Sequence, residues 1–172
     1  APQSIGPGAM AVAEATGRSD ALRVGMSIAV AIGFHNFAEG LAIGQAAAAD
    51  EISLAILLVI GFALHNATEG FGIVGPLAAA DEQASWGWLL AVGLIGGGPT
   101  FVGTLVGQRF TNDIVSIGFL GLAAGSILYV VQELMHVNRK FGLPVLVTWM
   151  LLLGLFLGFA TDFVLEAAEH AG

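Results

Sequence analysis

The sequence predicts an all-α membrane protein built as a bundle of five transmembrane helices. Of its 172 residues, 56% are hydrophobic and only 10% are charged, and its mean hydropathy is +0.87; these values lie outside the range of soluble domains. The apolar runs are continuous and much longer than the alternating segments of about ten residues that form membrane β-barrels. The 25 glycines suit helices that pack closely in a bilayer.

Five apolar segments justify the five helices in turn, and each is long enough to cross about 30 Å of hydrocarbon at 1.5 Å per residue. We expect the spans at residues 22–48, 52–77, 86–106, 114–136 and 144–168. Residues 1–21 are expected to form a polar tail or the end of a cytoplasmic loop, and residues 169–172 a short tail. The polar linkers are short, so neighbouring spans run antiparallel.

The few basic residues predict the orientation, because cytoplasmic loops retain Lys and Arg during insertion. Arg18, Arg23, Arg139 and Lys140 fall on one side of the five spans and Arg109 on the other. The chain start is therefore expected in the cytoplasm and the chain end outside, in a plasma or inner membrane. Five basic residues in all argue against nucleic-acid binding, and the absence of cysteine excludes thiolate metal ligands.

A polar motif repeats within the first two spans. Phe34–Gly40 and Leu64–Gly70 both read H-N-x-x-E-G after one apolar residue, thirty residues apart. The sequence after each motif repeats as well, since Ala48–Glu51 matches Ala79–Glu82. Each motif lies about halfway along its span, so the two are expected to meet near the midplane, where transporters place their binding sites.

The motif carries the ligands of a metal site. On a helix, positions i and i+4 share a face, while the intervening asparagine projects about 100° away from its histidine. A nitrogen and oxygen set of this kind suits Zn²⁺, Fe²⁺, Mn²⁺, Co²⁺ or Cd²⁺ as cargo, and suits Cu⁺ poorly. The candidate metal ligands are His35, Asn36, Glu39, His65, Asn66 and Glu69.

The motif allows two other interpretations. Polar groups inside membranes also form structural hydrogen bonds between helices, although two identical motifs at matched depth favour a shared functional role. The zincin signature H-E-x-x-H does not apply, because each motif has one histidine with its acid four residues later. Gly40 and Gly70 are expected to let another helix approach the site.

The pair of H-N-x-x-E-G motifs resembles the motifs in the fourth and fifth spans of the ZIP family of divalent metal transporters. The resemblance covers residues 22–168 and implies that these are the last five spans of an eight-helix protomer, with the missing N-terminal spans as partners and a possible homodimer. It implies that the two histidines and two glutamates shape one metal position. The asparagines with the same glutamates would shape a neighbouring position.

The sequence departs from the family pattern at three places. Ala38 and Thr68 stand where relatives usually carry proline, so the proline kink is not expected there. Many relatives also have a Glu-Pro pair in the sixth span, whereas Gly98-Pro99-Thr100 has no carboxylate; one bound ion is therefore expected. The run Gly96–Pro99 is expected to break or thin its helix beside the metal helices.

Three outlying polar residues are candidates for a metal pathway. Glu133 and His136 end the fourth span and are either exit ligands or a solvated helix end. Asp162 lies deepest in the acidic stretch of the last span and either collects cations or belongs to an exposed acidic terminus.

The leading functional hypothesis is a ZIP-type transporter, not an enzyme, that moves a divalent cation, most often zinc, toward the cytoplasm. One alternative is an intramembrane zinc-dependent hydrolase, for which Glu133 is the only candidate general base outside the motifs. The other is a non-transporting membrane subunit that binds a partner through its glycine-rich faces.

Overall fold

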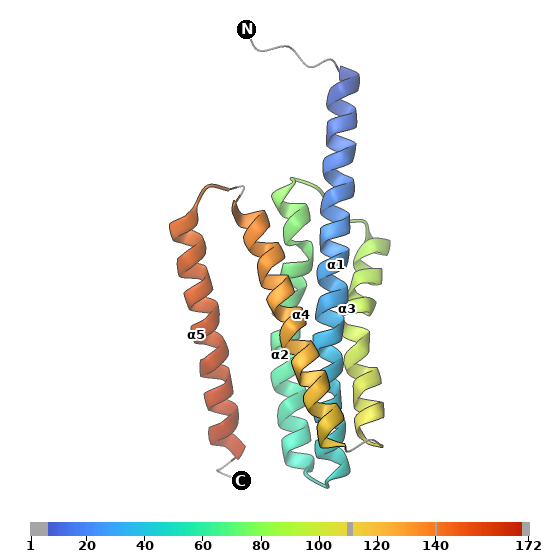
Figure 1. Ribbon diagram of the computed structural model, residues 1–172, viewed down its shortest axis with the longest axis vertical. Coiled ribbons are helices and arrows are strands. Elements are labelled where there is room, and N and C mark those ends of the chain that lie inside the picture. The colour runs from blue at the N-terminus through green and yellow to red at the C-terminus, as the bar shows by residue number, and fades with distance from the viewer. Residues whose placement is uncertain (1–6, 110–111, 140, 170–172) are drawn as a thin grey trace.

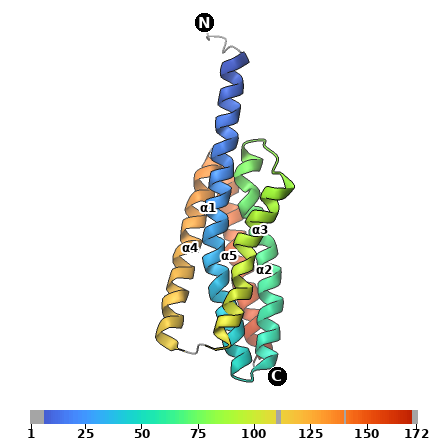
Figure 2. The same ribbon diagram turned by 90° about the vertical axis from the view of Figure 1, so that its right-hand side faces the viewer.

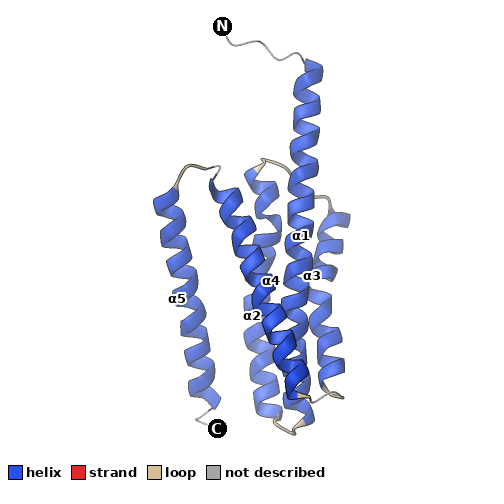
Figure 3. Cartoon of the chain, viewed as in Figure 1, coloured by secondary structure: helices blue, strands red, loops and turns tan. Residues whose placement is uncertain are grey.

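The structure, a computed structural model, describes residues 7–109, 112–139 and 141–169. Over these residues the regular elements are all helices (Figure 3). They are α1 (Pro7–Ala48), α2 (Ile52–Ala79), α3 (Trp86–Gly107), α4 (Asp113–Arg139) and α5 (Pro144–Glu169). Each contains a segment long and apolar enough to cross a membrane. The predicted fold class, an all-α bundle with five transmembrane helices, is confirmed.

The first helix begins earlier than expected. Residues from Pro7 onward are helical, whereas the sequence suggested a polar tail up to residue 21. The local reason is composition: Pro7 occupies the first helical position, where its missing N–H is harmless, and alanine and methionine after it are strong helix formers. At 1.5 Å per residue, the 42 residues of α1 measure about 63 Å. The helix therefore projects beyond the rest of the bundle (Figure 1).

Helix α1 is the centre of the bundle. It packs against α2, α3 and α4, which surround it in both views (Figures 1 and 2). In its most apolar segment 61% of the residues are buried, against 0% in α5. The buried core joins the four inner helices and consists of Ile28, Ala29, Ala31, Ile32, Ile73, Val92 and Val130.

A glycine seam holds α1 and α3 together. The seam consists of Gly33, Gly40 and Gly44 on α1 and Gly96, Gly103 and Gly107 on α3. A Cβ atom at Gly40 would overlap the carbonyl oxygen of Thr100, and one at Gly103 would overlap the carbonyl oxygen of Phe37. Backbone therefore lies against backbone, which small residues allow in the absence of a hydrophobic driving force between helices.

Helix α3 is continuous through Pro99, so the expected break at Gly96–Pro99 is wrong. Proline has no N–H, and the carbonyl of Ile95, four residues earlier, consequently lacks its usual helical donor. A Cβ atom at Gly33 would overlap the oxygen of that carbonyl. The seam thus buries the altered turn against α1 without ending the helix.

The repeat extends into the turns that follow each motif helix. Asp50 and Asp81 both adopt left-handed backbone conformations, with φ of 62° and 57°. The next residue closes the helix end in each case: the N–H of Glu51 donates to Ala46 at 3.0 Å, and that of Glu82 to Leu77 at 2.9 Å. This is the Schellman arrangement, with aspartate in the position that glycine usually takes.

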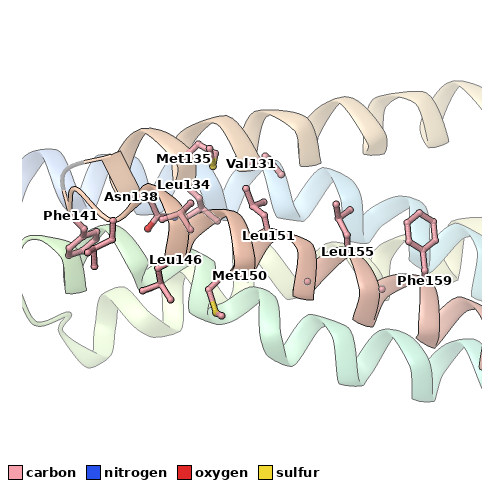
Figure 4. Close-up of a pocket in the computed structure, with 14 residues that line it drawn as sticks. Val131, Leu134, Met135, Asn138, Phe141, Leu146, Met150, Leu151, Leu155 and Phe159 are labelled. Atoms are coloured by element: carbon pink, nitrogen blue, oxygen red, sulfur yellow. The ribbon is translucent and has the colours of Figure 1, made fainter.

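Helix α5 lies at the edge of the bundle (Figure 1). An apolar groove separates it from α4, and Asn138 is its single polar lining residue (Figure 4). Gly154 and Gly158 line this groove and have no neighbour within 4 Å of an added Cβ atom. These two glycines, four residues apart, therefore do not serve packing among the described helices.

Candidate metal centre

The two motif helices bring four side chains together. His65 lies halfway along α2, about 20 Å from either end at 1.5 Å per residue. Glu39 Oε1 is 3.3 Å from His35 Nε2 and 3.3 Å from His65 Nε2. Glu69 Oε1 is 3.8 Å from His35 Nε2 and 3.5 Å from His65 Nε2. Each carboxylate thus approaches one histidine on its own helix and one on the neighbouring helix.

These distances are long for hydrogen bonds, whose N–H···O separation is usually about 2.7–3.2 Å. The Nε2 atom of His35 and both carboxylate oxygens of Glu39 are buried without a hydrogen-bond partner. By contrast, two ligand atoms of a tetrahedral ion with bonds of about 2.05 Å lie about 3.3 Å apart. The ligand atoms of His35, Glu39 and His65 all lie within 4.8 Å of one another. Their spacing therefore matches metal ligands better than direct pairing.

The two imidazoles are held in a common orientation. Their ring centroids are 5.7 Å apart and their planes differ by 8°. The rings of Phe62 and His65 form an edge-to-face contact, with 6.3 Å between their centroids. Both Nε2 atoms consequently face the same carboxylate oxygen of Glu39.

Burial differs sharply across the centre. The side chain of Glu39 is 6% exposed, those of Glu69 and His35 are 13% and 21% exposed, and that of His65 is 46% exposed. The centre is therefore enclosed at Glu39 and open at His65. An open side allows a ligand position for water or for an ion in passage, whereas structural zinc sites are usually closed by four protein ligands.

Asn36 connects the centre to α3. Its Nδ2 donates to the carbonyl oxygen of Gly96 at 2.9 Å, and its side chain is among the most deeply buried in the protein. The bond fixes the amide and leaves Oδ1 buried without a partner, as is Oδ1 of Asn66. Each motif therefore has one buried amide oxygen without a hydrogen-bond partner.

One residue that the sequence did not single out as a ligand joins this group. Thr100 of α3 has a hydroxyl oxygen that is buried and unpartnered. Among the described residues, every other buried side-chain nitrogen or oxygen without a hydrogen-bond partner belongs to the two motifs. In the sequence, Thr100 is distinguished only as the last residue of Gly98-Pro99-Thr100, a segment that has no carboxylate.

The remaining predicted residues lie apart or outside the described side chains. Glu133 and His136 lie in the last two turns of α4 and are not part of the ligand group. Asp162 belongs to α5, but its side chain is outside the described residues. Gly70 has nothing within 4 Å of an added Cβ atom, so the expectation that it admits another helix is wrong among the described helices.

The helices run without interruption through Ala38 and Thr68. Thr68 donates its hydroxyl to the carbonyl of His65 at 2.6 Å, and Ala38 is buried in α1. The ligand residues therefore keep regular helical spacing on both helices, which places His35 with Glu39 and His65 with Glu69 one turn apart.

Neither the comparison with curated proteins nor that with solved structures gave a significant match. The family model described as ZIP zinc transporter matches residues 11–165. This match covers all of α2, α3 and α4 and nearly all of α1 and α5. The chain therefore belongs to the ZIP family of zinc transporters.

Proposed function

We propose that the protein transports zinc or a similar divalent cation toward the cytoplasm through the centre formed by His35, Glu39, His65 and Glu69. The observation that carries the proposal is the spacing of these groups: two imidazole nitrogens at 3.3 Å from one buried carboxylate oxygen that has no hydrogen-bond partner. A carboxylate with no compensation at this depth costs several kcal/mol. A bound cation removes that cost.

The donor set sets the class of cargo. Imidazole nitrogens and carboxylate oxygens suit zinc and its neighbours, including Fe²⁺, Mn²⁺, Co²⁺ and Cd²⁺. The half-exposed His65 and the weak amide ligands allow release, which a closed four-ligand site would oppose. Family membership supports transport over the hydrolase alternative, and Glu133, the general base that a hydrolase would need, is not in the ligand group.

The proposed orientation of the bundle rests on the distribution of charge. Arg18 and Arg23 lie toward the start of α1 and Arg139 ends α4, at the same end of the bundle in Figure 1. Arg109 follows α3 at the opposite end. Arg18 pairs with Glu82 of the α2–α3 linker at 3.8 Å, which places that linker at the basic end too. This end is the cytoplasmic one under the positive-inside rule.

Uptake into liposomes tests the proposal. Vesicles that contain the full-length protein, with any spans that precede this segment, are expected to accumulate Zn²⁺ in a saturable manner. The double variant His35→Ala, His65→Ala is expected to lower uptake by at least about 100-fold, because even outer-shell partners of metal ligands change affinity by about 10- to 100-fold. A variant of equal yield that transports zinc normally would refute the proposal.

Metal affinity is expected to fall on acidification. Protons compete with the cation for the imidazole nitrogens and carboxylate oxygens, so binding releases protons. Zinc affinity should therefore be lower at about pH 5.5 than at about pH 7.5, because ligation requires the deprotonated imidazole. Calorimetric titration in buffers of different ionisation enthalpy measures both the affinity and the protons released. An affinity that stayed constant over this range would show that the histidines are not ligands.

A further inference from the structure

The hydroxyl of Thr100 differs from those of the other threonines whose side chains the structure describes. Each of the others donates to a backbone carbonyl three or four residues earlier on its own helix, at 2.6–2.9 Å: Thr68, Thr104, Thr148 and Thr161. This local bond is the usual way for a threonine to satisfy its hydroxyl inside a helix. Thr100 does not form it, although its hydroxyl oxygen is buried.

The structure gives a reason for the missing bond. The carbonyl four residues before Thr100 is that of Gly96, and it accepts the buried hydrogen bond from Asn36 Nδ2 at 2.9 Å. Asn36 belongs to the first metal motif. The side chain that offers an amide oxygen to the centre thus occupies the acceptor that Thr100 would otherwise use.

Helix geometry places Thr100 on the metal side of the seam. On the opposite side an apolar groove is lined by Ile95, Pro99 and Val102 of α3, together with residues of α1 that include Phe37. One residue advances a helix by about 100°. Pro99 and Thr100 therefore lie on opposite sides of the α1-facing direction, which is marked by Gly96 and Gly103.

The level of Thr100 along the bundle also matches the centre. Its carbonyl lies against Gly40, the residue that follows Glu39, one turn beyond the contact between Asn36 and Gly96. On α1, His35 and Glu39 lie on the flank away from the apolar groove, because they face α2. Thr100 thus lies on the same flank and at the same level as Glu39 and Asn36, with no hydrogen bond from its hydroxyl to either side chain.

We infer that Thr100 is the contribution of α3 to the metal centre: its hydroxyl contacts the cargo cation, or a water bound to it, and shifts the choice among divalent metals toward those that prefer oxygen. A hydroxyl donates one hydrogen bond and accepts others, so it can bind a cation or hold its water. Oxygen ligands favour Mn²⁺, while nitrogen and softer ligands favour metals later in the series. This inference rests on the proposed function.

The test compares three variants in the full-length protein in lipid nanodiscs, with Mn²⁺ and Cd²⁺ as the probes. Thr100→Val keeps the shape and removes the hydroxyl, and it is expected to weaken Mn²⁺ binding about tenfold, as expected for losing a hydrogen bond to a charged group. Cd²⁺ binding should change less than about twofold, because cadmium depends more on the imidazoles. Thr100→Ser should restore the wild-type preference.

Thr104→Val is the matched control, because Thr104 lies one turn further along α3 and its hydroxyl donates to the backbone carbonyl of Thr100. It should leave both affinities unchanged. If Thr100→Val lost affinity equally for both metals, or lost none, the inference would be overturned. The proposed function would still stand as long as the wild-type protein bound the metals. A wild-type protein that bound neither metal would overturn both.

Discussion

Replacing Glu39 by glutamine is expected to abolish metal binding at the midplane and to make the metal-free protein more stable. Glu39 is the most buried acid of the centre, with 6% of its side chain exposed, and its Oε1 is the atom nearest to both histidines at 3.3 Å. The amide keeps the size of the side chain and removes its negative charge. Zinc affinity should fall by at least about 100-fold.

The gain in stability distinguishes a metal ligand from a structural pair. Both carboxylate oxygens are buried without a hydrogen-bond partner, so nothing offsets the desolvation of this acid in the metal-free protein. A neutral amide in the same place is expected to raise the free energy of unfolding by about 1 to 3 kcal/mol. If Glu39 existed to pair with His35 and His65, its removal would instead destabilise the bundle.

Thermal unfolding in detergent, with and without zinc, measures both effects. Wild-type protein should melt at a higher temperature when zinc is present, because a ligand that binds only the folded state stabilises it. Glu39→Gln should melt higher than wild type without zinc and should not respond to it. Glu133→Gln, an acid on α4 outside the ligand group, is the control and should keep the full zinc response.

A Glu39→Gln protein that was less stable without metal, or that still responded to zinc, would contradict the metal assignment. Glu69→Gln should have a smaller effect, because Glu69 Oε1 lies further from the histidines, at 3.8 and 3.5 Å.

The convergence of the motifs was predictable because it depends on two local rules. His35 and Glu39 are four residues apart, as are His65 and Glu69, so each pair shares a helix face. A short linker makes α1 and α2 antiparallel neighbours, and equal depth in each span then brings the two pairs to one level. Similarly, the fold class follows from the length of the apolar runs alone.

The order of packing around α1 was not predictable. A helix that is apolar on all sides shows no stripe that identifies its buried face, so the sequence does not reveal that α1 is central or that α3 packs along its glycines. For this reason the role inferred for Thr100 was not predictable either. It depends on the contact between Asn36 and Gly96, sixty residues apart, and the pattern of residues within α3 does not predict that contact.

The start of α1 shows a different limit. The segment before residue 22 was expected to be a polar tail because its charges, glycines and serine lower its hydropathy. Helix formation, however, depends on backbone propensity, and the alanines after Pro7 favour it. Hydropathy therefore predicts which segment is apolar enough to cross a membrane and does not predict the residue at which the helix begins.

Gly40 and Gly70 occupy the same position in the two motifs, yet they are expected to respond to the same mutation in opposite ways. A Cβ atom at Gly40 would overlap the carbonyl oxygen of Thr100 and lie 2.9 Å from the amide nitrogen of Thr104. Both atoms belong to the backbone, which cannot relieve the overlap by changing rotamer as a side chain can. Nothing lies within 4 Å of a Cβ atom at Gly70.

Gly40→Ala should therefore separate α1 from α3 locally and lower the free energy of unfolding by about 3 kcal/mol, the upper end for overpacking. The same shift stretches the hydrogen bond from Asn36 to Gly96, one turn away, so zinc affinity should fall although no ligand has changed. Gly70→Ala should be neutral or up to about 1 kcal/mol more stable, since alanine is the better helix former.

Reversible unfolding in mixed detergent, together with zinc titration of each variant, checks this pair. The comparison is matched, because the two substitutions add one methyl group to identical H-N-x-x-E-G motifs and differ only in what faces them. Equal destabilisation by both would mean that Gly70 also meets a close neighbour, as it would in an assembly with further spans. No effect of Gly40→Ala would mean that α1 and α3 do not pack backbone against backbone, and the inferred position of Thr100 at the centre would then fail with the seam.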